Sequence, residues 1–296
     1  MDDPQVTDLL SGAVDLHCHP GPSPFPRQIG IPEAAGQAAE AGFRAIVVKS
    51  HHHSMVTDIL ALESPGGGGL PIPVFSGVAL NNQVGGINAY AVEMALHMGG
   101  KIVWFPTIAA SKHICVHSDE LKFPKTSRPM RHNHPLTILD DEGQLRPEVD
   151  DVIDVIVDHD AILACGHLDV AEVDALIRAA HDRGVDRIVV NHPNFVVGAG
   201  PDVCATWVEL GATIEHSLCM YDDRSTFYHW SVDVLLDYIK ACGTGHTILG
   251  SDLGQKENPL PVESYQRILR LLLDAGVDEK DLRRIVADNP AWLLGL

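Results

Sequence analysis

Eight short apolar runs, rich in β-branched residues, alternate with longer amphipathic segments along this chain of 296 residues, and this alternation limits the fold most. The runs have the length and composition of buried strands, and the segments between them have the period of helices that bury one face. The strand-like runs are residues 12–19, 44–49, 73–80, 101–107, 161–167, 187–192, 212–216 and 247–252. Eight strand–helix repeats predict an α/β fold, a (β/α)₈ TIM barrel, formed by residues 1–296 as a single domain.

The segments between the runs predict the helices of such a barrel. They cover residues 32–41, 88–98, 147–158, 170–183, 201–210, 231–241 and 262–275. The main rival is an open, doubly wound sheet, which usually carries a glycine-rich turn after its first strand. Here the first run ends in His-Cys-His-Pro instead, so the barrel is favoured.

The net charge and composition limit the kinds of partner that the protein can bind. The formal net charge of −19 argues against nucleic acid and anionic membranes, so we expect a small-molecule substrate. We find no apolar stretch of membrane-spanning length, no secretion signal and no CxxC pair among the six cysteines. These features predict a cytoplasmic protein that contacts no membrane, and they leave open whether its copies form a homo-oligomer.

Residues 109–146 break the alternation after the fourth strand. The segment is rich in histidine, lysine and arginine and has no clean period, so we interpret it as a lid insertion over the mouth of the barrel. Its cations in an acidic protein suggest that Arg128 and Arg131 bind an anionic group of the substrate.

The chain has 17 histidines, and the first strand holds two of them in a telling pattern. Asp15, His17 and His19 alternate along this strand and therefore point to the same face. In a barrel the polar face is the interior, so two imidazoles at the top of the strand can grip one metal ion.

Other ligand-type residues end later strands. His167 ends the fifth strand, His192 the sixth and Asp252 the eighth. The carboxyl ends of barrel strands converge on one face, which predicts that these side chains meet His17 and His19 there. Glu215 and His216 end the seventh strand and could bind metal or substrate at the same mouth. His51 lies just beyond the second strand and is expected to bind substrate there.

Together these motifs resemble the amidohydrolase superfamily of metal-dependent TIM barrels, over nearly the whole chain. The opening D-L-H-C-H-P-G-P of residues 15–22 is similar to that of amidohydrolase-like bacterial proteins, and Asn-Pro-Ala at 289–291 resembles the closing helix of the superfamily. The resemblance implies that His17, His19 and Asp252 hold one divalent ion, and that Asp252 is the catalytic proton shuttle. It further implies that His167 and His192 hold a second ion or complete a mononuclear site.

The resemblance also implies the cofactor, one or two divalent ions per chain. Zinc is expected, and manganese, iron and cobalt also suit nitrogen and oxygen ligands. Binuclear members usually bridge their ions with a carbamylated lysine or a glutamate after the fourth strand, and this chain has neither there. The nearest candidate ligand is Lys49, which closes the second strand.

Three functions follow from these residues. The first is a hydrolase that uses a metal-activated water to cleave an amide, lactone or ester bond of a small, anionic substrate. The second is a metal-dependent decarboxylase on the same scaffold, which suits a site without the bridge. The third is an aldolase that forms a Schiff base on Lys49, but it leaves the strand-end histidines unexplained.

Overall fold

The computed structural model describes residues 3–117, 126 and 128–296, which form two compact units. The first unit comprises Met1–Val48, Asp58–Phe75 and Glu215–Leu296, and the second comprises Lys49–Thr57 and Ser76–Ile214. The segment 109–146, interpreted above as a lid, lies partly outside the described residues.

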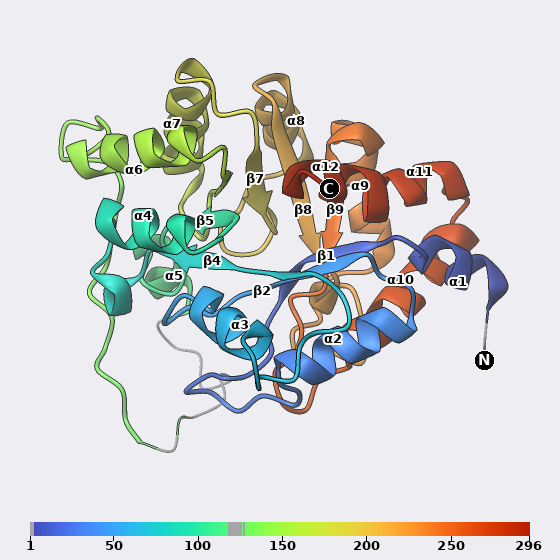
Figure 1. Cartoon of the computed structure of the whole chain (residues 1–296). Coiled ribbons are helices and arrows are strands. Elements are labelled where there is room, and N and C mark those ends of the chain that lie inside the picture. Colours follow the sequence, from blue (N-terminus) through green and yellow to red (C-terminus); the bar gives the residue numbers. More distant parts are fainter. Residues whose placement is uncertain (1–2, 118–125, 127) are drawn as a thin grey trace. The chain divides into compact units, whose positions relative to one another are not determined.

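The first unit contains a parallel sheet in the order β1–β2–β3 (Figure 1). Its strands are β1 (Val14–Cys18), β2 (Ala45–Val48) and β3 (Val74–Phe75), and Cys18 pairs with Val48 at the carboxyl ends. Beside β1, in the same unit, lies β9 (Thr247–Gly250). Every residue of β1, β2 and β9 is buried, as expected for parallel strands that are covered on both faces.

The second unit contains four parallel strands paired in chain order. They are β4 (Gly77–Ala79), β5 (Ile102–Trp104), β6 (Ile162–Ala164) and β7 (Ile188–Asn191). The next strand in the order is β8 (Ala212–Ser217), which begins in the second unit and ends in the first.

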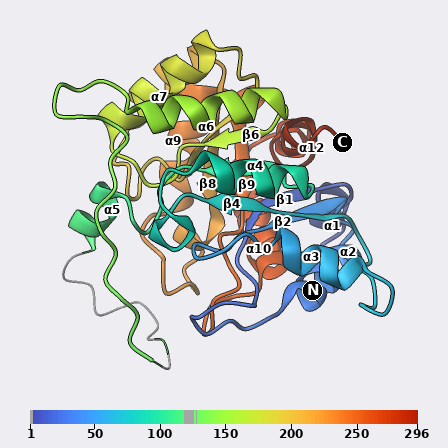
Figure 2. The same ribbon diagram turned by 60° about the vertical axis from the view of Figure 1, so that its left-hand side comes forward.

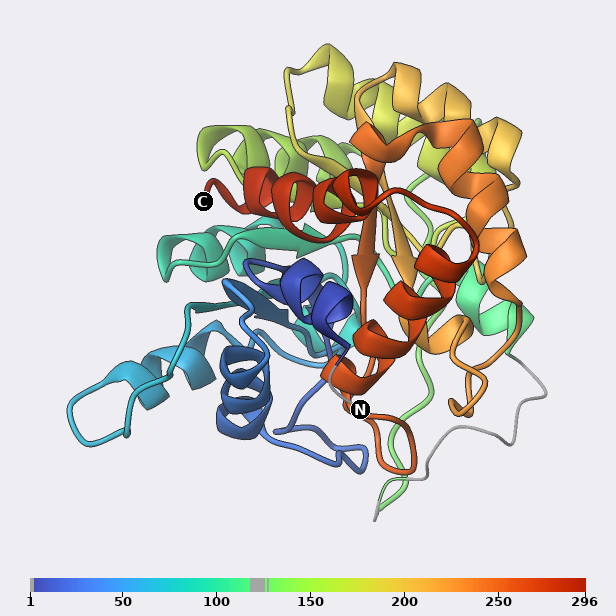
Figure 3. The same ribbon diagram turned by 90° about the vertical axis from the view of Figure 1, so that its right-hand side faces the viewer.

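The longest helix of the first unit shows why its helices form. In α10 (Pro261–Asp274) the residues Tyr265, Ile268, Leu269 and Leu272 recur at helical spacing and are fully buried. Burying each such side chain stabilises the fold by roughly 1.5–3 kcal/mol. In the first unit α1 (Pro4–Leu10) packs against α10 and α11 (Figure 3). The remaining helices there are α2 (Ile31–Glu40), α3 (Val56–Glu63, which starts in the second unit), α9 (Val232–Cys242), α11 (Glu279–Arg283), a π-helical turn (Arg284–Asp288) and α12 (Asn289–Leu294).

In the second unit α4, α6 and α7 pack against the strands β4, β6 and β7 respectively, and α4 lies beside α6 (Figure 2). The helices of this unit are α4 (Ala89–His97), α5 (Ser111–Val116), α6 (Pro147–Asp158), α7 (Val170–Asp182) and α8 (Pro201–Glu209). Short 3₁₀ turns occur at Asn82–Val84, Leu218–Met220 and Thr244–His246. Among the described residues, no helix combines the length and the apolar character needed to span a membrane.

The α/β class with parallel strands is confirmed, and all seven helices predicted above start and end within one residue of the observed bounds. One predicted strand differs. Residues 73–80 form two strands, β3 and β4, which separate at the buried Ser76 and pair with β2 and β5 respectively. The apolar character of the run gave no sign of the break, because apolar residues stand on both sides of Ser76. At Gly77 a Cβ atom would lie 1.6 Å from the carbonyl oxygen of Ile102, so only glycine fits there.

Candidate metal centre

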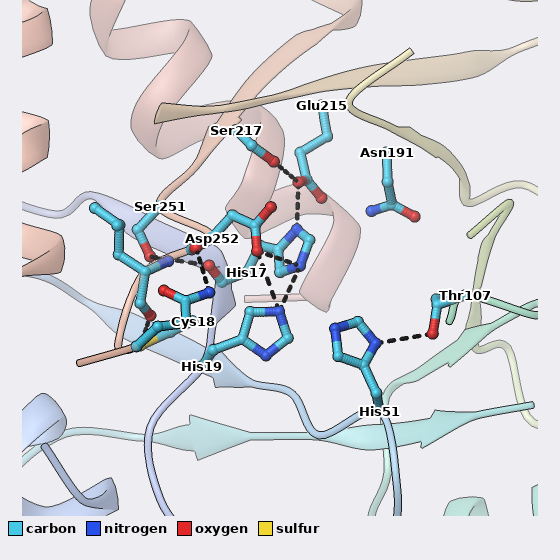
Figure 4. Close-up of polar contacts among 12 residues, drawn as sticks. His17, Cys18, His19, His51, Thr107, Asn191, Glu215, Ser217, Ser251 and Asp252 are labelled. Atoms are coloured by element: carbon cyan, nitrogen blue, oxygen red, sulfur yellow. Dashed lines mark hydrogen bonds and ion pairs between the residues drawn. The ribbon is translucent and has the colours of Figure 1, made fainter. Parts of the chain in front are cut away.

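Three ligand-type side chains of the first unit converge at the carboxyl ends of β1 and β9 (Figure 4). The Nε2 atoms of His17 and His19 lie 3.2 Å apart. The Oδ1 atom of Asp252 lies 3.4 Å from the first nitrogen and 3.1 Å from the second. Ligands at about 2.0–2.1 Å from a tetrahedral zinc ion lie roughly 3.3 Å apart. The spacing of this triad therefore fits a divalent metal ion.

The triad is positioned by main-chain hydrogen bonds between the end of β1 and the segment after β9. The amide of Asp252 donates to the carbonyl of His17 (2.6 Å), and the amide of His19 donates to the carbonyl of Leu253 (2.7 Å). Asp15 links the two segments from behind, because its carboxylate accepts from the amides of His17 and Ser251, both at 2.9 Å. The ligand positions are thus fixed by backbone geometry.

Glu215, at the end of β8, orients one of the two imidazoles (Figure 4). Its Oε1 atom lies 2.6 Å from Nδ1 of His17, and both side chains are 1% exposed. Since a carboxylate only accepts, Nδ1 of His17 carries the proton, and in the neutral ring Nε2 then offers its lone pair to the triad. Carboxylate–histidine pairs of this kind support the ligands of many metal sites.

Glycine makes room for this pair. A Cβ atom on Gly250 would lie 2.8 Å from Cβ of His17 and 3.1 Å from Oε1 of Glu215. A larger residue in this position would push the imidazole and its carboxylate apart. Gly250, two residues before the predicted ligand Asp252, is therefore needed for the geometry of the site.

The electrostatics of the triad favour metal binding over protonation. Burial lowers the pKa of His19 to about 3, against a smaller opposing effect of the Asp252 carboxylate, so the ring is neutral at physiological pH. Asp252 has φ 52°, a left-handed conformation that costs free energy in residues other than glycine and is commonly found at functional sites.

A second group of histidines lies within the second unit. His167 follows β6, and its Nδ1 atom lies 2.8 Å from Nδ1 of His113 on α5. The ring of His192 lies 4.8 Å from that of His167, centroid to centroid, and His117 lies 4.4 Å from His113. Burial, followed by the neighbouring histidines and Lys49, lowers the pKa of His167 well below its ordinary value, and burial lowers that of His113 to about 3.

Lys49 and His51 also belong to the second unit. Lys49 is 1% exposed, and its Nζ atom lies 5.2 Å from the ring centroid of Trp104 on β5. Nδ1 of His51 lies 2.8 Å from the hydroxyl of Thr107 (Figure 4). That hydroxyl also accepts a hydrogen bond from the buried Asn81, which fixes this part of the site.

The remaining predicted substrate residues have different surroundings. His216 is buried in the first unit, with its Nδ1 atom 3.3 Å from the hydroxyl of Tyr221. Glu215, predicted above to bind substrate, contacts His17. Arg128 and Arg131 are both exposed to solvent.

Two residues near these groups were not singled out as site residues by the sequence. His113 lies in the segment 109–146, which has no clean period. Its spacing of four residues from His117 is typical of two side chains on the same face of a helix and could have indicated the pair. Arg27 follows the first strand at a distance that no ligand motif predicts. Both were found only through tertiary contacts.

Comparison with known proteins agrees with the architecture. Residues 12–215 match the sequence model of a family described as a family of unknown function, DUF6282. Nothing matches among curated proteins. A similar solved structure is an amidohydrolase from Pseudomonas aeruginosa, with 11% identity, 98% of this chain and 97% of that chain covered, and a TM-score of 0.62.

Two further solved structures are similar to the chain. A probable 2-pyrone-4,6-dicarboxylic acid hydrolase from Acinetobacter baumannii, with citric acid bound, has 11% identity, coverage of 96% and 100%, and a TM-score of 0.60. A 2,6-dihydroxybenzoate decarboxylase in complex with 2,6-dihydroxybenzoate has 12% identity, coverage of 97% and 100%, and a TM-score of 0.58. At these identities the likeness shows the fold alone, and it agrees with the α/β architecture expected from the sequence.

Proposed function

The chain belongs to the DUF6282 family, and we propose that it is a metal-dependent hydrolase that cleaves an amide, lactone or ester bond of a small, anionic substrate. The observation that carries this proposal is the convergence of His17, His19 and Asp252, with ligand atoms 3.1–3.4 Å apart. The Glu215 carboxylate also supports this proposal. It is buried against Nδ1 of His17, and carboxylates in this position commonly orient the imidazole of a metal ligand.

These three residues would hold the ion, and zinc is the expected metal. A divalent ion bound there supplies Lewis acidity and lowers the pKa of a coordinated water. Manganese, iron and cobalt accept the same nitrogen and oxygen ligands and are the alternatives.

The remaining chemistry is performed by the chain's own side chains. With one oxygen of Asp252 in the triad, the other carboxylate oxygen accepts a proton from the attacking water and returns it to the leaving group. The hydrogen bond that Nδ1 of His17 donates to Glu215 keeps the ring in the tautomer that presents Nε2. The backbone bonds between β1 and the segment after β9 hold these groups in place as charge develops.

The two units are further proposed to close one (β/α)₈ barrel over residues 1–296, with 109–146 as its lid. His167 and His192 would then face the triad and bind a second ion or complete a single site. Lys49 directly follows Val48, the strand partner of Cys18, and this register supports a carbamylated Lys49 as a bridge between two ions.

Lys49→Ala tests that bridge. Loss of one of two ions, with activity partly restored by short carboxylic acids, is expected for a bridging carbamate. Full retention of both ions in this variant would contradict it and leave Lys49 as a residue for the substrate. Elemental analysis of the purified variant and wild type is the measurement.

A decarboxylase is the second candidate, and one observation favours it. β5 is followed by Phe105, Pro106 and Thr107, none of which bridges metals, and a mononuclear site is sufficient for metal-dependent decarboxylation. Carbon dioxide release from a panel of aromatic acids would distinguish this reaction from hydrolysis.

The hydrolase proposal is tested by metal content and turnover together. Protein from metal-supplemented medium should contain between one and two divalent ions per chain. The zinc- or manganese-loaded protein should hydrolyse at least one member of a panel of amides, lactones and esters that carry a carboxylate. Less than about a third of an ion per chain, or metal without hydrolysis of any panel member, would overturn the proposal.

A further inference from the structure

Arg27 lies in the connection between β1 and α2, and this connection is fastened to the segment that follows Asp252. The backbone of Arg27 forms an antiparallel bridge with Gln255, whose side-chain amide donates to the carbonyl of Asp252 (3.0 Å). The amide of Gln28 donates to the carbonyl of Gly254 (2.8 Å). A Cβ atom on Gly254 would lie 2.2 Å from the carbonyl oxygen of His19, so this segment also packs directly on the triad's backbone.

The guanidinium of Arg27 is close enough to the triad to act on its charges. Its charge interacts favourably with the carboxylate of Asp252. Burial lowers the pKa of Arg27 to about 10, so the side chain still carries its positive charge at neutral pH. Keeping the positive charge of Arg27 partly buried beside the triad therefore costs solvation free energy.

This guanidinium lacks a partner that would offset that cost. Within the parts of the chain that the structure describes, it forms no side-chain hydrogen bond and no salt bridge, and its Nε atom is buried without a hydrogen-bond partner. Arg267 and Arg270 of the first unit also have a buried Nε atom without a hydrogen-bond partner, but both form ion pairs, Arg267 with Asp223 and Arg270 with Asp3. Buried donors are almost always satisfied, so the unpaired Nε of this half-buried guanidinium, which also has no ion-pair partner, indicates a ligand of opposite charge.

The surroundings favour a carboxylate over a phosphate. A guanidinium offers parallel N–H donors that match one carboxylate and its single charge. A phosphate carries more charge and usually uses a helix N-terminus or several cations. The nearby N-terminus of α2 is already capped, because the Glu33 carboxylate accepts from the amide of Gly30 (3.0 Å).

We infer that Arg27 binds a carboxylate of the substrate and so directs the scissile bond toward His17, His19 and Asp252. This inference rests on the proposed hydrolase and specifies its substrate class as a carboxylic acid. It assigns anion recognition to the connection after β1, whereas the sequence assigned it to the exposed Arg128 and Arg131.

Calorimetric titration of the zinc-loaded protein with glutarate and benzoate, and with their neutral amides glutaramide and benzamide, is the test. Wild type should bind at least one of the two acids and discriminate against its amide. Arg27→Gln should weaken that binding by about 10- to 100-fold, the loss expected for a charge-assisted hydrogen bond. Arg27→Lys should recover part of it, and the control Arg178→Gln, at an exposed arginine on α7 that pairs with Asp174, should leave it unchanged.

Metal content and thermal melting of each variant separate the outcomes. Three results would each overturn the inference. The folded Arg27→Gln variant could bind the acid as tightly as wild type does, or wild type could bind neither acid. Wild type could also bind inorganic phosphate more tightly than the acids. If Arg27→Gln does not fold, the inference would be overturned by an Arg27→Lys variant that binds the acid as tightly as wild type does. Protein that binds an acid through Arg27 but holds no metal would contradict the hydrolase while preserving the carboxylate site.

Discussion

The two units each contain a cluster of buried histidines, yet the clusters are built differently. In the first unit His17 and His19 share a centre with Asp252, and Glu215 holds His17 from behind. In the second unit His113, His117, His167 and His192 contact one another through their rings. Among the described residues, the three-ligand group with ligand atoms all within 4.8 Å is the one in the first unit.

The difference shows that the number of histidines does not by itself define a metal site. A ligand ring needs its tautomer set and its position fixed, and the first unit achieves both with a carboxylate and with backbone hydrogen bonds. In the second unit burial lowers the pKa values of His113 and His167, and their rings lie close together, so both can contribute ligands to a centre. From this comparison we expect the ligands of the first unit to bind the metal more tightly than the histidines of the second.

Replacing one candidate ligand in each unit should give the largest difference in metal content between variants. We expect His17→Ala to lose nearly all bound metal and all turnover, because it removes one of three converging ligands. His167→Ala should retain about one ion per chain. Equal metal loss in the two variants, measured by elemental analysis, would contradict tighter binding by the first unit.

Asp252→Asn separates metal binding from proton transfer within the first unit. The amide oxygen can still ligate, but it cannot accept a proton, so turnover should fall by about 10²–10⁴-fold while much of the metal stays bound. Rate measurements at saturating substrate, with metal counted on the same sample, provide the check. Near wild-type turnover would remove Asp252 from the catalytic role.

Glu215→Gln tests whether the carboxylate behind His17 is what distinguishes the two clusters. Loss of its charge should weaken metal affinity by about 10- to 100-fold, as measured by competition with a chelator. Ser217→Ala is the matched control, because Ser217 donates to the same oxygen of Glu215 at 3.4 Å without touching His17. An unchanged affinity in Glu215→Gln would mean that backbone geometry alone positions the ring.

The pH dependence of the unfolding free energy tests how strongly the second unit buries its histidines. His113 titrates near 6.5 in the unfolded chain, and burial lowers its pKa to about 3 in the fold. Between these values only the unfolded chain binds the proton, so stability should fall as pH falls, by up to about 1.4 kcal/mol per pH unit. Above about pH 7 neither state binds it, and this contribution is constant.

In metal-free protein His113→Gln should therefore flatten the dependence of unfolding free energy on pH between about 4 and 6. Denaturant titration at several pH values measures this slope, and His181→Gln, an exposed histidine on α7 of the same unit, is the control. The same slope in both variants and wild type would show that burial of His113 does not affect acid stability.

Local patterns carried the secondary structure. The helical period located seven helices, and alternation along the first strand placed His17 and His19 on one face. Strand ends also marked Asp252 as a ligand candidate, because the carboxyl edge of a parallel sheet is a property of chain direction. These features depend on residues close together in sequence, so the sequence determined them by itself.

Tertiary structure decided the roles that depend on distant contacts. Glu215 supports His17 from 198 residues away, and Arg27 reaches the triad through a backbone bridge to Gln255. The split of residues 73–80 between β3 and β4 likewise follows from pairing with different partner strands. A sequence pattern records which face of an element is buried, but the group that a buried side chain meets is set by how the elements pack.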